Sequence, residues 1–95
     1  MGSESDWPVI QSTTSVLKDL GVEFEVRVSS AHRTPEETRI YITDAESRGC
    51  GVFICAAGMA AHLAGALKSN SSLPVMGVPL KGGVVDGLDS LLSTV

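Results

Sequence analysis

The stretch GVFICAAGMAAHLAGALK, residues 51–68, decides the fold. Its first six residues form a short apolar run of the kind that fills a buried parallel strand. The next three residues, Ala57-Gly58-Met59, are predicted to form a turn. Residues 60–68 are rich in alanine and leucine, which favours a helix. A strand that passes through a short turn into a helix is the repeating unit of a parallel α/β sheet.

The same plan extends along the chain in both directions. Apolar and charged residues alternate over 22–28, which predicts a strand with one well-buried face. Because strands and helices alternate with short links, we predict a single domain over residues 1–95. Its class would be α/β, a three-layer doubly wound parallel sheet of flavodoxin-like or Rossmann-like type. The other expected elements are a helix between Asp6 and Gly21, a helix from Thr34 towards Gly49, a strand over 74–78 and a helix from about Asp86.

Two of these helix starts carry capping signals. Asp6 stands close before a proline, and we expect it to cap the first helix. At the second start, Thr34 would be the N-cap and Glu37 would close a capping box.

The composition excludes several classes of partner. With a net charge of −4 and a pI near 4.9, the chain has no broad basic surface for nucleic acid or an anionic membrane. No apolar stretch approaches the ~20 residues that span a bilayer, and no signal peptide precedes the domain. Cys50 and Cys55 lack zinc or redox spacing and are expected as small buried thiols. We therefore expect a cytoplasmic protein without a bound metal.

Ligands of open α/β sheets bind beyond the carboxyl ends of the strands. The loops expected to gather there are 2–6, 29–34, 56–59 and 79–85. In the first, Ser3 and Ser5 supply hydroxyls beside the free N–H groups of a helix start, which suits a phosphate. A serine-rich helix start can also be only a cap, and both interpretations stay open. Asp6 can cap the helix or accept hydrogen bonds from ribose hydroxyls.

The second loop places His32 beside Arg33, between the predicted strand and a helix. A guanidinium can bind phosphate through two parallel hydrogen bonds. Its charge would disfavour protonation of the neighbouring imidazole, which leaves His32 able to accept or donate a proton near neutrality. The alternative is an exposed His-Arg pair at a helix start, and the position at the ligand-binding edge favours a site.

The third loop consists of small residues around Gly58, which would let a flat ring lie close to the backbone. For His62, in the first turn of the predicted helix, a packing or capping role and a site role are equally open. We expect Met59 to fill a gap in the core or an interface. Lys81 stands beside two glycines, but the phosphate-binding motif of nucleoside triphosphatases is absent.

Taken in order and spacing, five segments of the chain resemble class I PurE proteins. They are MGSESDW at 1–7, VSSAHRTP at 28–35, AAHL at 60–63, LPVMGVP at 73–79 and DGLDSLLS at 86–93. The resemblance implies a cofactor-free and metal-free mutase of purine biosynthesis. Such an enzyme converts N5-carboxyaminoimidazole ribonucleotide into 4-carboxyaminoimidazole ribonucleotide by decarboxylation and recarboxylation in a closed site.

The same resemblance implies a role for each site residue. His32 would be the general acid and base, Asp6 would hold the ribose, and Arg33 would hold the phosphate. The other substrate-binding residues it implies are Ser3, Ser5, Ser30 and Gly58. It also implies a homo-octamer with sites at subunit contacts and a small ribonucleotide as the substrate.

The chain departs from this family in two respects. Ala56, Met59 and Ala64 replace two glycines and a proline of the family's A-G-A-G-G-A-A-H-L-P-G loop, which alters the pocket floor. Family members also begin with a strand before Met1 and continue beyond Val95. We therefore expect the first strand and the C-terminal elements to be missing, and the 95-residue chain to fold or assemble poorly.

Two other functions stay open. The class II relatives are carboxylases that use CO2 directly and carry a lysine in place of Arg33, so the arginine favours the mutase. A non-catalytic nucleotide-binding module of flavodoxin-like fold would use the same loops without needing His32.

Overall fold

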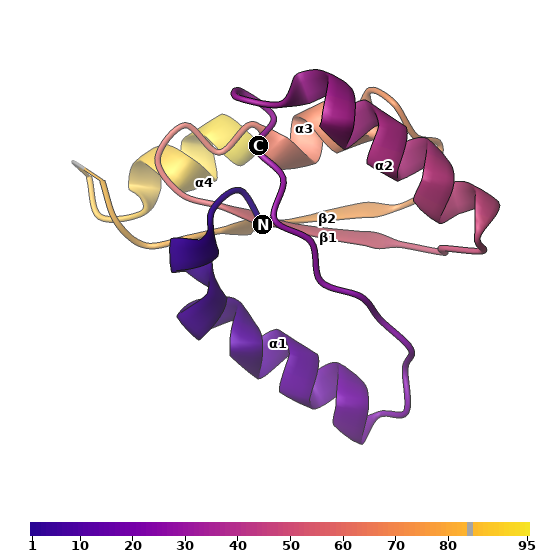
Figure 1. The fold of residues 1–95 in the computed structure, drawn as a ribbon. Coiled ribbons are helices and arrows are strands. Elements are labelled where there is room, and N and C mark those ends of the chain that lie inside the picture. Colours follow the sequence, from indigo (N-terminus) through magenta and orange to yellow (C-terminus); the bar gives the residue numbers. More distant parts are fainter. Residues whose placement is uncertain (84) are drawn as a thin grey trace.

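The structure, a computed structural model, describes residues 1–83 and 85–95 and has the predicted α/β organisation (Figure 1). Position 84, in the loop predicted at 79–85, lies outside the described residues. The elements are the 3-10 helix η1 (Glu4–Asp6), α1 (Trp7–Asp19), α2 (Pro35–Ser47), β1 (Phe53–Ala57), α3 (Leu63–Lys68), β2 (Val75–Pro79) and α4 (Leu88–Thr94). Within the described part, no helix has the length and apolar character needed to cross a membrane.

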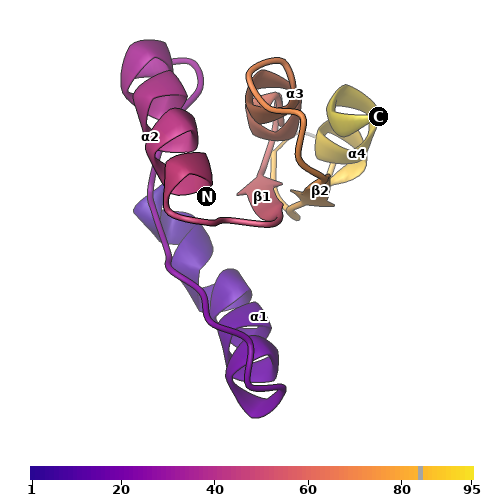
Figure 2. The same cartoon turned by 90° about the vertical axis from the view of Figure 1, so that its right-hand side faces the viewer.

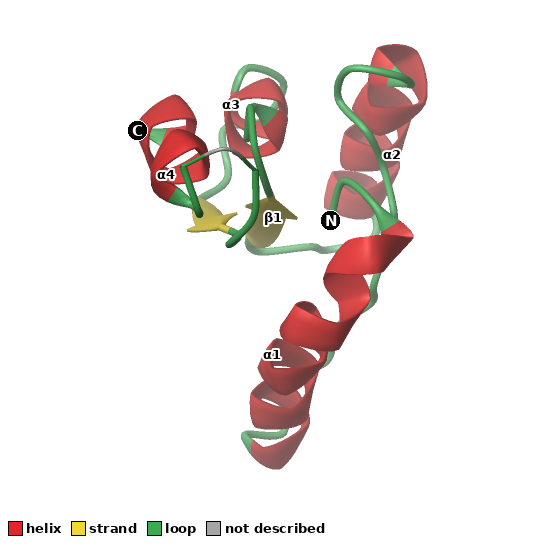
Figure 3. Cartoon of the chain, turned by 90° about the vertical axis from the view of Figure 1, so that its left-hand side faces the viewer, coloured by secondary structure: helices red, strands yellow, loops and turns green. Residues whose placement is uncertain are grey.

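The sheet is parallel, as predicted. Strands β1 and β2 pair from Phe53 opposite Val75 to Ala57 opposite Pro79, and α3 forms the crossover between them. Helices α2, α3 and α4 lie on one side of the sheet and α1 lies on the other (Figures 1 and 2). Helix α4 lies next to α3, on the β2 side (Figure 3). Helices on both faces give the layered arrangement that buries a parallel sheet.

Alternate side chains of β1 enter two different cores, because successive residues of a strand point to opposite faces. Phe53 and Cys55 pack with side chains of α2 and α3. Ala56 points the other way and packs with Ile10 of α1 and with Leu80. The apolar run therefore forms the buried strand that its composition predicts.

The strand predicted over residues 22–28 is not formed, so this prediction was wrong. The segment has no regular secondary structure, although its apolar side chains alternate as a strand requires. These side chains are 40–48% exposed: Val22, Phe24, Val26 and Val28. Alternation describes which side chains share a face, whereas a strand also needs a neighbouring backbone to pair with.

Among the described residues, Met1 alone supplies part of such a neighbouring backbone. The Met1 ammonium donates to the Arg27 carbonyl at 3.0 Å, and the Ser29 amide donates to the Met1 carbonyl at 2.9 Å. The next residue, Gly2, bonds β1 and not segment 22–28, since its amide donates to the Ala56 carbonyl at 3.2 Å. The rest of segment 22–28 borders an open groove of about 600 Å³ that separates it from β1. The backbone of residues 23–26 thus makes no hydrogen bond to another backbone within the described residues.

Both predicted caps also differ from the structure. Ser3 caps the first helical turn: its Oγ accepts from the Ser5 amide at 3.3 Å, and the Asp6 carboxylate accepts from the Ser3 amide at 3.1 Å. Because η1 precedes α1, the unpaired N–H groups of the helix start belong to η1. Asp6 is the last residue of η1, and its side chain makes no cap to α1. Thr34 makes no side-chain cap, because its hydroxyl donates instead to the Ser30 carbonyl at 3.1 Å.

Candidate functional site

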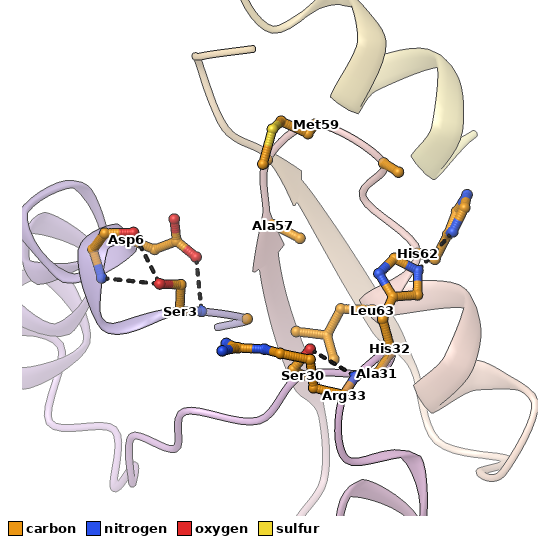
Figure 4. Close-up of a pocket in the computed structure, with 14 residues that line it drawn as sticks. Ser3, Asp6, Ser30, Ala31, His32, Arg33, Ala57, Met59, His62 and Leu63 are labelled. Atoms are coloured by element: carbon orange, nitrogen blue, oxygen red, sulfur yellow. Dashed lines mark hydrogen bonds between the residues drawn. The ribbon is translucent and has the colours of Figure 1, made fainter.

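A pocket of about 370 Å³ lies at the carboxyl end of β1, where three loops meet (Figure 4). The loops are those before α1, before α2 and between β1 and α3. The pocket is lined by all the residues predicted as site residues: Ser3, Ser5, Asp6, Ser30, His32, Arg33 and Gly58. The loop at 79–85, which we expected to join them, contributes none of its described residues. Three of the four predicted loops therefore gather at the edge where parallel sheets bind ligands.

The first loop combines capping with a position in the pocket. The Ser3 hydroxyl lies 2.9 Å from the Ser5 hydroxyl, and both face the pocket while Ser3 caps η1. The carboxylate of Asp6 closes the capping box through one oxygen, Oδ2. Its other oxygen makes no hydrogen bond to the described residues and can accept one from a ligand. The two interpretations of this loop are thus compatible.

The second loop is a tight turn organised by Ser30. The Ser30 hydroxyl accepts from the Arg33 amide at 3.2 Å, and its carbonyl accepts from the Thr34 amide at 2.9 Å. The turn leaves the side chains of His32 and Arg33 exposed and lining the pocket. In Figure 4 the Arg33 side chain extends towards the loop that carries Ser3. Within residues 1–83 and 85–95, Arg33 forms no ion pair, so its guanidinium can bind an anion.

His32 and His62 form a hydrogen-bonded pair. Nε2 of His32 lies 3.0 Å from Nδ1 of His62, and the two rings meet edge to face with centroids 5.1 Å apart. One nitrogen must carry the proton while the other offers its lone pair, so at least one ring is neutral. The bond also orients His32 and couples its tautomer to that of His62. The role of His62 was left open by the sequence, because no spacing rule links residues 30 positions apart.

The loop that carries His62 is irregular. The predicted helix from Ala60 begins only at Leu63, because Met59 has a left-handed backbone with φ +51°. Two tight turns follow, in which the Ala61 amide donates to the Met59 carbonyl at 3.0 Å and the His62 amide to the Ala60 carbonyl at 2.9 Å. Met59 itself is 64% exposed and lines the pocket, so of its two expected places the core is wrong and an interface stays a prediction.

The two cysteines take no part in the pocket. Both are free thiols. Cys55 lies in the core, and burial raises the pKa of its thiol to about 11, which keeps it protonated and unreactive. Cys50 is only half-buried, so the expectation of a buried thiol holds for Cys55 alone.

The comparison with known proteins gives a family over the full length of the chain. The family model described as AIR carboxylase matches residues 1–95. An N5-carboxyaminoimidazole ribonucleotide mutase of Pyrococcus abyssi is 52% identical over 95 residues, which are all of this chain and 55% of that protein. A mutase of the same name from Pseudomonas aeruginosa is 48% identical, with the chain covering 58% of it.

A larger relative carries a different name. The Phosphoribosylaminoimidazole carboxylase of Saccharomyces cerevisiae is 52% identical over 95 residues, which are 17% of that protein. The chain thus spans about half the length of the mutases that it matches and a smaller part of the yeast protein. Since the family model and these relatives all align with the entire chain, the chain belongs to the AIR carboxylase family.

Proposed function

We propose that this chain carries the substrate site of the purine-biosynthesis mutase that converts N5-carboxyaminoimidazole ribonucleotide into 4-carboxyaminoimidazole ribonucleotide. The observation that carries this proposal is the hydrogen-bonded pair of His32 and His62 in a pocket that also holds Arg33 and Asp6. A proton carrier and an anion-binding group in one small pocket are what this reaction requires. The names of the archaeal and bacterial relatives support the same reaction.

The reaction moves one carboxyl group and carries one proton between two atoms. The bond from N5 to the carboxyl carbon breaks, CO2 is released, and N5 takes a proton from His32. C4 then forms a bond to CO2 with its own electron pair, and the proton lost from C4 returns to His32. No oxidant or reductant is consumed. A histidine suits both transfers because its ordinary pKa, about 6.5, lies near neutrality.

The remaining pocket residues would hold the nucleotide. Arg33 would bind the phosphate through its guanidinium, and Asp6 would accept hydrogen bonds from the ribose hydroxyls. The hydrogen bond from His62 would keep the His32 ring in one orientation, as partner groups of catalytic histidines do. The residues that would complete the pocket are Ser3, Ser5, Ser30 and Gly58.

For the whole protein, the proposal includes a cytoplasmic homo-octamer with sites at subunit contacts, in which residues 1–95 belong to a single domain. We expect a small ribonucleotide as the ligand and neither a nucleic acid nor a membrane as a partner. The net charge of −4 and the pI near 4.9 support the second point, because polyanions bind basic surfaces. The mutase itself needs no cofactor or metal for the steps given above.

A carboxylase that takes CO2 from solution is the second candidate. The yeast relative supports it, since the protein named Phosphoribosylaminoimidazole carboxylase matches the whole chain. Arg33 favours the mutase, because the class II carboxylases that this family resembles carry a lysine there.

The substitution His32→Asn tests the proposal in the complete gene product. We expect turnover without ATP to fall at least about 100-fold, because general acid–base catalysis contributes that much, while binding of the ribonucleotide persists. Calorimetric titration with the product checks the binding. Ser12→Ala is the control, since among the described residues the Ser12 hydroxyl bonds only the Val9 carbonyl of its own helix, at 2.9 Å. If both wild type and variant bind the ribonucleotide without turnover, the protein is a binding module and the proposal is wrong.

A further inference from the structure

Three hydroxyls on one helix, α4, connect it to the strand end and to the pocket loop. Ser90 is fully buried, and its hydroxyl lies 2.7 Å from the Leu80 carbonyl, just beyond β2. Thr94 packs against Gly77 of β2 so closely that a Cβ at Gly77 would lie 2.5 Å from its methyl carbon. These contacts fix α4 on the sheet, at a place where no larger residue than glycine fits.

The other contacts of α4 go to the loop between β1 and α3, and two of them meet at one residue, Ala61. The amide of Ala61 donates to the Ser93 hydroxyl at 2.9 Å, and the Thr94 hydroxyl lies 3.2 Å from the Ala61 carbonyl. Ser93 also lies 3.2 Å from the Met59 carbonyl. Ala61 is 2% exposed, so its backbone polar groups have little access to water. Its amide is shared between the Ser93 hydroxyl and the Met59 carbonyl, and the partner of its carbonyl among the described residues is the Thr94 hydroxyl.

This loop needs partners outside itself. Its internal bonds are two tight turns over 59–62, and one of its residues, Met59, stands in the left-handed region at φ +51°. Neither a helix nor a strand ladder holds residues 58–61. Because Ala61 directly precedes His62, the position of Ala61 sets where the His62 ring can lie. That ring makes the 3.0 Å contact with His32.

We propose that Ser93 and Thr94 are positioning residues of the site: by holding Ala61 from both sides, they place His62 against His32. Neither is among the described residues that line the pocket. Their effect on the reaction rests on the proposed function, whereas their effect on the geometry of the histidine pair does not. Neither residue was singled out by the sequence, since a hydroxyl in the last turn of an apolar helix is most often bonded within that helix.

The test compares Ser93→Ala with wild type in the complete gene product. We expect kcat to fall about 10-fold to 100-fold, as misplacement of a catalytic group by a fraction of an ångström to 1 Å does. KM should change little, because Arg33 and Asp6 lie on other loops. Ser93→Thr, which retains a hydroxyl, should recover most of the lost kcat. Ser12→Ala is the matched serine control, because its hydroxyl has no partner outside α1 among the described residues.

A crystal structure of Ser93→Ala supplies a readout that does not depend on turnover. We expect Nε2 of His32 and Nδ1 of His62 to lie beyond hydrogen-bond distance, more than about 3.5 Å apart. Unchanged kcat and an unchanged pair, with only a lower melting temperature, would overturn the proposal and leave Ser93 a structural residue. If the wild type shows no turnover, the proposed function fails. The distance between the two rings in Ser93→Ala then decides by itself whether Ser93 positions His62.

A second variant covers the case in which Ser93→Ala does not fold. Thr94→Val keeps the methyl that packs against Gly77 and removes the hydroxyl, which lies 3.2 Å from the Ala61 carbonyl and 2.7 Å from the Ser90 carbonyl of its own helix. We expect kcat to fall and the two histidine rings to separate, both by less than in Ser93→Ala. Thr43→Val on the exposed face of α2 is its control, since the Thr43 hydroxyl bonds only the Arg39 carbonyl of that helix within the described part of the chain. Equal behaviour of the two valine variants would contradict the positioning role.

Discussion

Gly58 lines the pocket without needing to be glycine for the backbone. Its φ is not in the left-handed region, and an added Cβ would lie 3.8 Å from the Cβ of Leu80, an ordinary contact. Nothing in the fold therefore requires the side chain to be absent. The space that it leaves belongs to the pocket, which supports a ligand lying close to this backbone.

The substitution Gly58→Ala should therefore affect binding and not folding. We expect KM for the ribonucleotide to rise about 10-fold or more, since an extra methyl group in a packed space costs about 1–3 kcal/mol. The melting temperature should stay level or rise slightly, because alanine restricts the unfolded chain. Steady-state kinetics and thermal unfolding check the two parts.

Gly65→Ala is the control for this substitution. Gly65 lies in α3 with nothing within 4 Å of an added Cβ, and it is not among the pocket residues. It should gain stability without a change in KM. A Gly58→Ala variant with wild-type KM would mean that no ligand approaches this backbone.

At single residues, the sequence predicted which loops meet but not how their side chains pair. Ser3, His32 and Gly58 are found in one pocket because residues that follow parallel strands share one edge of the sheet. The contact between His32 and His62 could not be predicted, because it depends on the left-handed turn at Met59 that delays α3. A methionine gives no signal for a positive φ, unlike glycine.

At the level of elements, segment 22–28 is held to α2 by a charged cluster. Glu25 receives hydrogen bonds from Arg48 at 2.7 Å and from the Tyr41 hydroxyl at 2.6 Å, and the Arg27 guanidinium lies 5.1 Å from the centre of the Tyr41 ring. The Arg48 and Tyr41 hydrogen bonds lower the pKa of Glu25 to about 2. Burial, followed by the Glu25 contact, raises the pKa of Tyr41 to about 12. Where backbone pairing is absent, side chains fix the segment.

This cluster predicts a pH dependence. Since the folded-state pKa of Glu25 is depressed, its contribution to stability is present above the ordinary carboxylate pKa and is lost as the pH falls from about 4.5 towards about 2. Glu25→Gln should therefore be less stable than wild type at pH 7, and the difference should shrink across that window. Urea unfolding at several pH values measures it.

Glu23→Gln provides the comparison. Glu23 is exposed, lies two residues earlier in the same segment and makes no ion pair with the described residues. Its replacement should leave stability nearly unchanged at pH 7. If Glu25→Gln and Glu23→Gln behave alike over the whole pH range, the cluster does not stabilise the segment.

Helices and strands could be predicted where the sequence pattern is local. The prediction failed where an element needs to pair with a backbone far away in the sequence. Helices α1 and α2 follow from apolar spacing and proline at the first turn, both visible within a few residues. Segment 22–28 has a strand's alternation, but beyond α1 the only described backbone that bonds it is that of Met1, at Arg27. The two predicted caps failed for separate reasons: the turn η1 precedes α1 and is capped by Ser3, and the Thr34 hydroxyl donates to the Ser30 carbonyl.

Across the whole molecule, the pocket depends on parts of the chain that are far apart in sequence. Loops before α1, before α2 and after β1 line it, and α4 holds one of them from behind. The α/β class and the parallel sheet followed from the order of the elements. The groove of about 600 Å³ beside β1 did not, because it reflects which backbone lies next to which strand.

The fate of the carboxyl carbon tests the central claim most directly. The complete gene product would be given N5-carboxyaminoimidazole ribonucleotide labelled with ¹³C in its carboxyl group, in buffer with excess unlabelled CO2 and without ATP. A mutase with a closed site predicts 4-carboxyaminoimidazole ribonucleotide that retains the label, and His32→Asn should abolish its formation. Product that carries unlabelled carbon, formed equally well from aminoimidazole ribonucleotide and dissolved CO2, would contradict the mutase and identify a carboxylase.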